Sequence, residues 1–240
     1  MKNLLITCII SILVLCTCLK PDNYDDTITT NVIQLSPDST SLTVYEGYLS
    51  QNIYYDYPAI LSRLQYPNSS KAIPITYDFS PGVAPPGLIV KKEFNDTTKL
   101  LTMNVTQNSG RETFILGGLI DNLQSVCINE NLNNRPAGNN ILVRFVHAVP
   151  NTTNYDVMLG KQLIFSNKAF FSNDSIVGSY LNLPSSKDTF FVFKTGTNQL
   201  VSSMPCIPFT TASKFTLSIS GIEGATNYQK IRMSVFIDNF

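Results

Sequence analysis

The stretch Lys214-Phe215-Thr216-Leu217-Ser218-Ile219-Ser220 alternates strictly between polar and apolar side chains. Because successive side chains of a β-strand point to opposite faces of a sheet, this period of two predicts a strand with one face in a core. Other runs with the same alternation are 143–145, 155–159 and 233–237. Turn residues such as Gly, Pro and Asn separate the runs, and short strands at this spacing predict a β-sandwich.

Blocks of the first half of the chain recur in the second half in the same order. The segment 37–47 lies over 150–160 without a gap, and Pro, Thr, Val and Gly are identical between the two. The other matched blocks are 69–71 with 185–187, 101–105 with 215–219, and 125–129 with 234–238. A period of this size predicts two tandem copies of one domain and not a solenoid of short repeats.

The predicted fold class is all-β, with two tandem immunoglobulin-like or transthyretin-like antiparallel β-sandwich domains after a signal peptide. Charged residues make up only 14% of the chain, against roughly 25% in typical soluble domains. Ser, Thr and Asn take their place, and these side chains compete with the helical backbone. The one short helix we expect lies around 59–64. The predicted segments are a signal peptide 1–17, a polar tether 18–30, a first copy 31–130, a linker 131–139 and a second copy 140–240.

The N-terminus has the features of a bacterial export signal. A short basic start precedes an apolar run over 4–15, which is too short to cross a bilayer, since that takes about 20 apolar residues. Cysteines come directly after this run, as in the lipobox of bacterial lipoproteins. Cys18 has the required aliphatic residue three positions earlier, Leu15, and the less usual Thr17 directly before it. Cys16 is the fallback, because bulky Leu15 precedes it directly. We expect lipidation at Cys18; a plain secretory signal is the alternative.

The second copy opens with a motif that resembles a known family. The stretch Ile141-Leu142-Val143-Arg144-Phe145-Val146-His147-Ala148-Val149-Pro150, followed by Tyr155-Asp156-Val157, resembles the first strands of the domain-of-unknown-function 4397 family. The resemblance implies a β-sandwich, tandem copies and an envelope location, and it implies no activity. The first copy departs from the motif, since Val32-Ile33-Gln34-Leu35-Ser36-Pro37 lacks the Arg, the Phe and the His. The lipobox and the Asn-rich composition are also similar to those of Bacteroidetes outer-membrane lipoproteins.

The sequence contains no recognisable catalytic constellation. His147 is the only histidine, and it has no second His or Cys at the spacing of a zinc site. We interpret His147 as bonded to turn backbone near Pro150. Motifs for a nucleophile elbow, a zinc protease or a phosphate loop are missing. We therefore expect no catalytic residues, no metal and no cofactor. Equal numbers of basic and acidic residues, 17 of each, predict no nucleic-acid partner.

Three groups of residues are candidates for contacts or modification. Tyr54, Tyr55 and Tyr57 form the densest aromatic run, which predicts either a half-buried strand or a platform for a glycan or peptide. This run lies in the first copy, where we would look for a specialised binding role. Asp followed by Ser or Thr is similar to the O-glycosylation signal of Bacteroidetes and is also common in turns. The acceptors would be Thr27, Ser39, Thr97 and Ser175.

Two cysteines, Cys127 and Cys206, remain after export. An oxidising compartment permits a disulfide between them, but Cys127 aligns with Phe236 in the repeat, which favours a small buried thiol in the core of a copy. We expect Cys206 in a loop or at a sheet edge.

The function that these features favour is a lipid-anchored, non-enzymatic binding or structural module of the cell envelope. We expect its location to be the outer membrane, on the periplasmic or the surface face, and its partner to be a glycan or an envelope protein. The alternative is a carbohydrate-processing or other hydrolytic lipoprotein, in which Asp and Glu residues from separate strands meet in a cleft between the copies.

Overall fold

The computed structural model describes residues 25–39, 41–50, 53–54, 59–69, 73–78, 86–92, 99–105, 111–130, 135–172, 180–184, 188–206 and 213–237. The regular structure in these ranges is β-strand throughout, apart from one 3-10 turn, η1 (Ile120–Asn122). None of the described segments forms a helix of the length and apolar character needed to cross a membrane.

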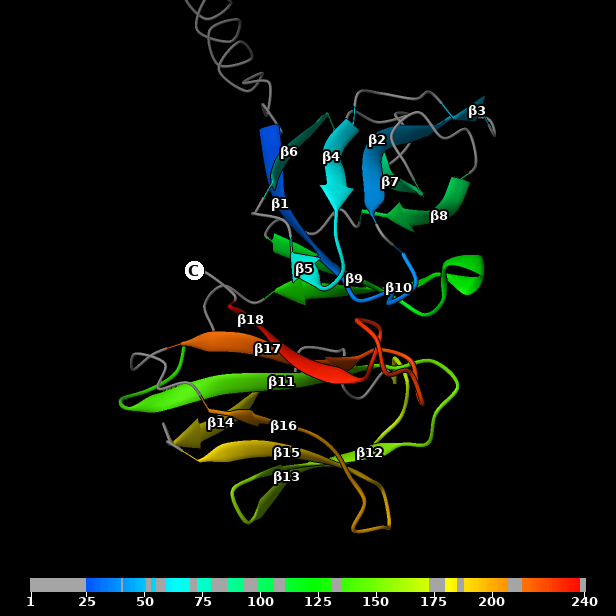
Figure 1. Ribbon diagram of the computed structural model, residues 1–240. Coiled ribbons are helices and arrows are strands. Elements are labelled where there is room, and N and C mark those ends of the chain that lie inside the picture. Colours follow the sequence, from blue (N-terminus) through cyan, green and yellow to red (C-terminus); the bar gives the residue numbers. More distant parts are fainter. Residues whose placement is uncertain are drawn as a thin grey trace, which may run out of the picture.

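The first ten strands make two sheets that face each other (Figure 1). One sheet has the order β10-β9-β1-β5, with β6 beside β1, and the other has the order β3-β2-β7-β8, with β4 beside β2. We call this pair of sheets the first sandwich. Its strands are β1 (Asp25–Gln34), β2 (Leu42–Ser50), β3 (Ile53–Tyr54), β4 (Ala59–Leu64), β5 (Asn68–Ser69), β6 (Ile73–Asp78), β7 (Pro86–Lys91), β8 (Lys99–Asn104), β9 (Arg111–Gly117) and β10 (Gln124–Glu130).

The remaining strands form the second sandwich, with sheets β14-β11-β17-β18 and β13-β12-β15-β16. Its strands are β11 (Asn140–Ala148), β12 (Tyr155–Leu159), β13 (Gln162–Lys168), β14 (Leu181–Pro184), β15 (Thr189–Lys194), β16 (Leu200–Pro205), β17 (Lys214–Ser220) and β18 (Arg232–Ile237).

The two sandwiches share one topology. In each sandwich, the penultimate strand is a neighbour of the first strand in the sheet. The two pair in parallel, β1 with β9 and β11 with β17. The other pairings are antiparallel. The prediction of an all-β fold with tandem β-sandwich copies is therefore confirmed. The parallel pair in each copy adds a feature that alternation alone does not reveal.

Each sandwich has its own apolar core between its two sheets. The first core includes Val32, Leu42, Val44, Leu88, Val90 and Phe114. The second includes Val143, Phe145, Tyr155, Val157, Phe190, Phe215 and Leu217. These residues come from the inward positions of alternating strands, as the period of two predicts.

A third cluster joins the sandwiches. Ile33, Leu35, Ile115 and Ile128 of the first copy pack against Val146 and Ala148 of the second, and Val126, Phe171 and Phe236 are added at the margin. The first-strand sheets of the two copies therefore lie face to face, and the molecule has four β-layers (Figure 1). Every residue from Ile141 to Ala148 is buried, because β11 has a core on each side. This double burial explains the nearly continuous apolar run that opens the second copy.

The interface between the copies is close to self-complementary. The alignment of 37–47 with 150–160 makes Ile33 equivalent to Val146 and Leu35 equivalent to Ala148. Both members of each pair lie in the cluster that joins the sandwiches. Equivalent patches on both partners are the property of an isologous, two-fold interface. The duplicated domains thus pair as two subunits of a symmetric dimer would.

Two predicted segments differ from the structure. The tether 18–30 is not polar linker throughout, because β1 begins at Asp25 and its residues 25–30 pair with β6; Thr and Ile are strand formers. The short helix expected around 59–64 is strand β4, which pairs with β2. A backbone in this position gains the ladder hydrogen bonds of the sheet, and local propensity is weaker than that gain.

The register also corrects two blocks of the repeat. Strand β8 holds residues 101–104, but the strand that occupies the place of β17 in the first copy is β9. The last block is shifted by one residue. Cys127 pairs with Phe114 as Val235 pairs with Leu217, so Cys127 is equivalent to Val235. Phe236 corresponds to Ile128 and lies in the joining cluster. A slip of one residue in a strand exchanges its faces.

Neither of the two described cysteines forms a disulfide. Cys127 packs against the first core and Cys206 lies in the second, so each copy holds one. Burial raises the pKa of the Cys127 thiol to about 12, with the carboxylates of Glu112 and Glu130 adding to the shift. Cys206 comes directly after edge strand β16 but is buried, which places the residue at a sheet edge, as expected, without exposing its thiol.

Candidate functional site

His147, the single histidine, is fully buried at the end of β11. Its Nδ1 accepts a hydrogen bond from the Val149 N–H at 3.1 Å, and its Nε2 lies 3.3 Å from the Thr153 carbonyl oxygen and from Thr152 Oγ1. Burial lowers the pKa of His147 to about 4, although the bond to Thr153 opposes the shift. The interpretation of His147 as a turn-bonded residue is confirmed.

The equivalent position of the first copy holds a side chain that accepts the same kind of hydrogen bond and does not titrate. Gln34 is the residue equivalent to His147 in the aligned repeat. Its side-chain Oε1 accepts a hydrogen bond from the Ser36 N–H at 2.9 Å, again two residues along the chain. An amide, which does not titrate, thus makes the bond that the imidazole makes in the second copy.

A cluster of charged side chains is buried between the copies. Glu130, at the end of β10, lies 2.6 Å from Arg144 Nη2 and 3.1 Å from Lys214 Nζ. Tyr180 donates a hydrogen bond to Glu130 at 3.0 Å, and its ring lies under both cations. Arg144 also donates to Thr216 at 2.6 Å. One carboxylate of the first copy therefore binds two cations of the second.

This cluster does not supply the acid and base of the hydrolytic alternative. Burial tends to raise the pKa of Glu130, but Arg144 and Lys214 outweigh it and hold the pKa below its ordinary value. Glu130 is thus an ion-paired carboxylate at neutral pH and no proton donor. Glu112, the nearby buried carboxylate on β9, lies opposite Asn129 of β10. Because side chains alternate along a strand, the side chain of Glu112 is on the other face of the sheet from that of Glu130.

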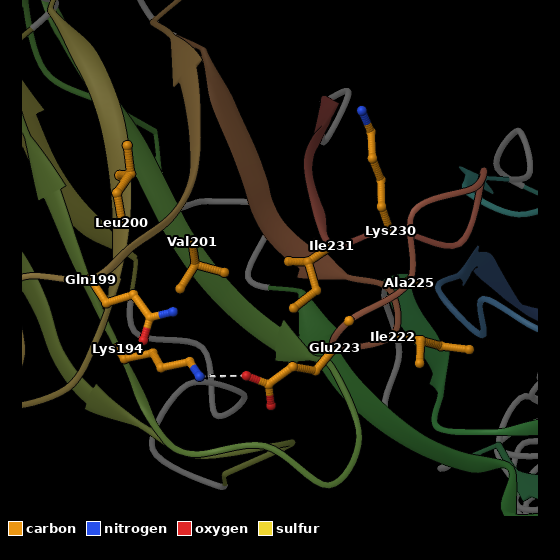
Figure 2. A pocket seen from close by; sticks show the side chains of 10 residues that line it. Lys194, Gln199, Leu200, Val201, Ile222, Glu223, Ala225, Lys230 and Ile231 are labelled. Carbon is orange, nitrogen blue, oxygen red and sulfur yellow. Dashed lines mark hydrogen bonds and ion pairs between the residues drawn. The ribbon is translucent and has the colours of Figure 1, made fainter.

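The described part of the second sandwich contains a groove of about 460 Å³ at one end (Figure 2). One wall comes from the end of β15 and the start of β16, and the other from the connection between β17 and β18, residues 221–231. Lys194 and Glu223 form an ion pair across it. The lining residues are Lys194, Gln199, Leu200, Val201, Ile222, Glu223, Gly224, Ala225, Lys230 and Ile231.

The connection 221–231 is held in place by its own hydrogen bonds. The Ile222 N–H donates to the Gln229 carbonyl at 2.8 Å, and the Lys230 N–H donates to the Asn227 carbonyl at 3.1 Å. Asn227 Oδ1 also accepts from the Gln229 N–H at 2.9 Å. Bonds within the connection itself therefore hold this wall of the groove. In the sequence, residues 221–227 indicate only a turn; the signals for a groove were the apolar Ile222 and Ile231 inside a polar loop.

Several predicted sites lie outside the described residues: Cys16, Cys18, Tyr55, Tyr57, Thr97 and Ser175. The backbone of Tyr54 pairs with Leu49 in β3, and that of Thr27 pairs with Thr76 in β1. Ser39 is 2% exposed, so the folded domain does not present its hydroxyl for glycosylation.

Comparison of this chain with known proteins gave matches to solved structures. No family model matches it, and no curated protein matches it either. The solved structures it is similar to include CBMbc, of family CBM26, from Eubacterium rectale Amy13K in complex with maltoheptaose, at 11% identity and a TM-score of 0.25, covering 89% of this chain and 98% of that one. The fimbrial anchor protein Mfa2 from Porphyromonas gingivalis matches at 12% identity and a TM-score of 0.23, with the same coverage. Likenesses this weak carry no argument about function.

Proposed function

We propose that this chain is a lipid-anchored protein of the cell envelope, in which two fused β-sandwiches act as a non-enzymatic binding or structural module. The observation that carries the proposal is the joint between the copies. Its apolar cluster and its buried ion pairs connect the two sandwiches through side chains, in addition to the covalent connection of the linker. A module of this kind holds its outer loops at a defined distance from its anchor.

The chemistry of the described residues fits a module that binds or supports. Its histidine is neutral and bonded to a turn, and its buried Glu130 is paired with two cations. Both groups are buried and bonded within the chain, so neither is placed to meet a substrate as a general acid or base. The proposed anchor is a lipid on Cys18, with Cys16 as fallback, and the proposed location is the outer membrane of a Bacteroidetes-type cell. The resemblance to the domain-of-unknown-function 4397 family supports the same envelope location.

Fractionation of a Bacteroidetes host that expresses the full-length chain tests the anchor. We expect the unchanged chain in the membrane fraction and Cys18→Ala in the soluble fraction, because two or three acyl chains hold a protein far more firmly than a protein surface does. Cys16→Ala is the matched control and should remain with the membrane. A Cys18→Ala chain that still partitions with membranes contradicts the proposal.

A panel of glycoside and peptide substrates tests the absence of enzymatic activity. We expect no turnover by the purified chain. Turnover that is lost in Glu130→Gln would instead support the hydrolytic alternative and would require that carboxylate to leave its ion pairs.

A further inference from the structure

The groove of the second sandwich lies at a strand edge. Within the described residues β16 has a single strand neighbour, β15, so its other edge is unpaired. Strand β18 approaches β16 from the opposite sheet, and the connection 221–231 that leads into β18 forms the far wall of the groove. An unpaired edge presents backbone N–H and C=O groups that can pair with a further strand.

The side chains that line this edge suit an extended chain. Val201, Ile222 and Ile231 supply aliphatic surface, and Leu200 is 50% exposed at the rim. Pro205, which would block pairing, lies at the far end of β16, away from the groove. In addition, β16 has a bulge at this end. Val192 pairs with Ser202 and Phe193 pairs with Leu200, so Val201 has no partner residue on β15. Bulges turn a strand edge and re-aim its side chains.

The polar groups of the groove point to the same class of occupant. Lys194 and Glu223, which pair with each other across the groove, bring one positive and one negative charge to its lining, and Gln199 brings an amide. This mixed set complements the N–H and C=O dipoles and the polar side chains of a peptide. It would complement a uniformly charged ligand less well. None of the ten lining residues is aromatic, so the groove has no ring on which a sugar could stack.

We propose that the groove binds an extended polypeptide segment with alternating apolar side chains, which adds a strand to the free edge of β16. The segment would place every second side chain against Val201, Ile222 and Ile231, and its backbone would pair with the start of β16. Strand addition of this kind derives affinity from main-chain bonds and selectivity from the pockets beside them. A volume of about 460 Å³ lies within the range of about 300–1,000 Å³ typical of ligand sites. This inference deepens the proposed function by naming the ligand class.

Selection from a phage-displayed library of random linear peptides tests the proposal. The purified full-length chain in detergent is the target, and Ala225→Trp, which fills the groove from a side chain outside both cores, is the counter-target. Thr226→Trp is the matched control, since its position adjoins Ala225 but does not line the groove. We expect peptides with alternating apolar residues to be enriched on the unchanged chain and on Thr226→Trp. We expect no such enrichment on Ala225→Trp.

Fluorescence polarisation of one enriched peptide then separates the modes of binding. We expect Ala225→Trp to weaken binding at least about tenfold and Thr226→Trp to change it less than about twofold. A copy of the peptide with N-methylated amides on alternate residues should also bind at least about tenfold more weakly, because it cannot donate ladder hydrogen bonds.

Any of the following binding results would overturn the proposal: no enrichment on the unchanged chain, equal binding by Ala225→Trp, equal binding by the N-methylated peptide, or preferential binding of a labelled oligosaccharide. A chain that forms dimers in sedimentation, but not as Ala225→Trp, would make a second copy the occupant and would also overturn it. Each result leaves the lipid anchor untouched, because fractionation decides that question separately.

Discussion

The connection between β9 and β10 and the connection between β17 and β18 join equivalent strands in two different ways. In the first copy residues 118–123 form a short turn, and the Ile120 N–H donates to both carboxylate oxygens of Asp38, at 2.9 and 3.0 Å. Ile120 packs on the core. In the second copy residues 221–231 bond to themselves and leave a groove beside β16.

This difference shows where the duplicated domain has changed. Both connections begin with a glycine at a positive φ, Gly118 at 88° and Gly221 at 129°, a conformation that favours glycine. The rest of each connection is free to lengthen, since loops tolerate insertions that strands do not. The sequence directed attention to the tyrosine run of the first copy; the described geometry directs it to the loop of the second.

The largest expected effect breaks the joint between the copies. Glu130→Ala leaves Arg144 and Lys214 buried without their carboxylate, and we expect a loss of about 3–5 kcal/mol in the free energy of unfolding. Urea unfolding of the mature chain measures the loss, with fluorescence and circular dichroism followed together because two sandwiches can unfold separately. Glu223→Ala, at the exposed ion pair, is the control and should change little. An unchanged midpoint for Glu130→Ala would contradict this account of the joint.

Acid should affect the two copies differently at the His147 and Gln34 positions. His147 has a pKa of about 4 when folded and 6.5 as a free side chain, so below pH 6.5 the unfolded state binds the proton first. The contribution of neutral His147 to the free energy of unfolding is therefore complete above about pH 6.5. It falls by up to about 3 kcal/mol as the pH falls toward 4. Stability curves from pH 8 to about 4 measure this slope.

The matched variant for the acid experiment is His147→Gln, which copies the first sandwich. It should flatten the slope between pH 6.5 and 4, because Gln does not titrate, and it should retain the turn bond that Gln34 makes. The remaining loss below about pH 4.5 belongs to groups such as Glu130, whose lowered pKa contributes stability only above that range. A slope that is the same in both chains would exclude His147 as its source.

Gly117→Ala tests how tightly the copies fit. A Cβ at Gly117, in the first copy, would lie 2.6 Å from Cζ of Phe171 in the second copy and 3.3 Å from Cβ of Ala148. We expect a loss of about 1–3 kcal/mol, the usual cost of overpacking. The double variant with Phe171→Ala should lose less than the sum of the two single changes, as a coupled pair does. Additive losses in a thermal melt would mean that the ring of Phe171 does not contact residue 117.

The smallest effect concerns the short connection itself. Asp38→Ala removes the acceptor of the Ile120 N–H, and we expect a loss of about 1.5 kcal/mol, at the low end for a charged acceptor because the site is half-buried. Asp121→Ala, on the exposed side of the same turn, is the control. Hydrogen exchange of the Ile120 amide should rise in the first variant only. Equal exchange in both would show that Asp38 does not hold this turn.

Much of the fold was predictable from local patterns. Alternation in 214–220 placed a strand with its apolar side chains in a core, and all of Phe215, Leu217 and Ile219 are there. The block 37–47 over 150–160 identified the duplication because it falls on β2 and β12, which occupy the same place in both copies. The segment 59–64 was wrong because helix and strand signals are both weak in six residues, and the partner strand decided between them.

The candidate site was much less predictable. Residues of the groove come from the end of β15, the start of β16 and the connection 221–231, and nothing in their spacing along the chain brings them together. The same holds for Glu130, Arg144 and Lys214, which three different strands contribute. Arg144 and His147 read alike in the motif, as polar residues in an apolar run, yet one binds a carboxylate across the joint and the other binds its own turn.

The sequence by itself determined the strands, their inward faces and the presence of two copies, because alternation and repetition are properties of neighbours along the chain. Only the tertiary structure decided that the outer faces of two sheets meet, that β11 is buried on both sides, and that a longer loop opens a groove at a free strand edge. The reason is physical: these features depend on which surfaces come into contact across long separations, and the free energy of that contact belongs to the pair of surfaces and not to either segment alone.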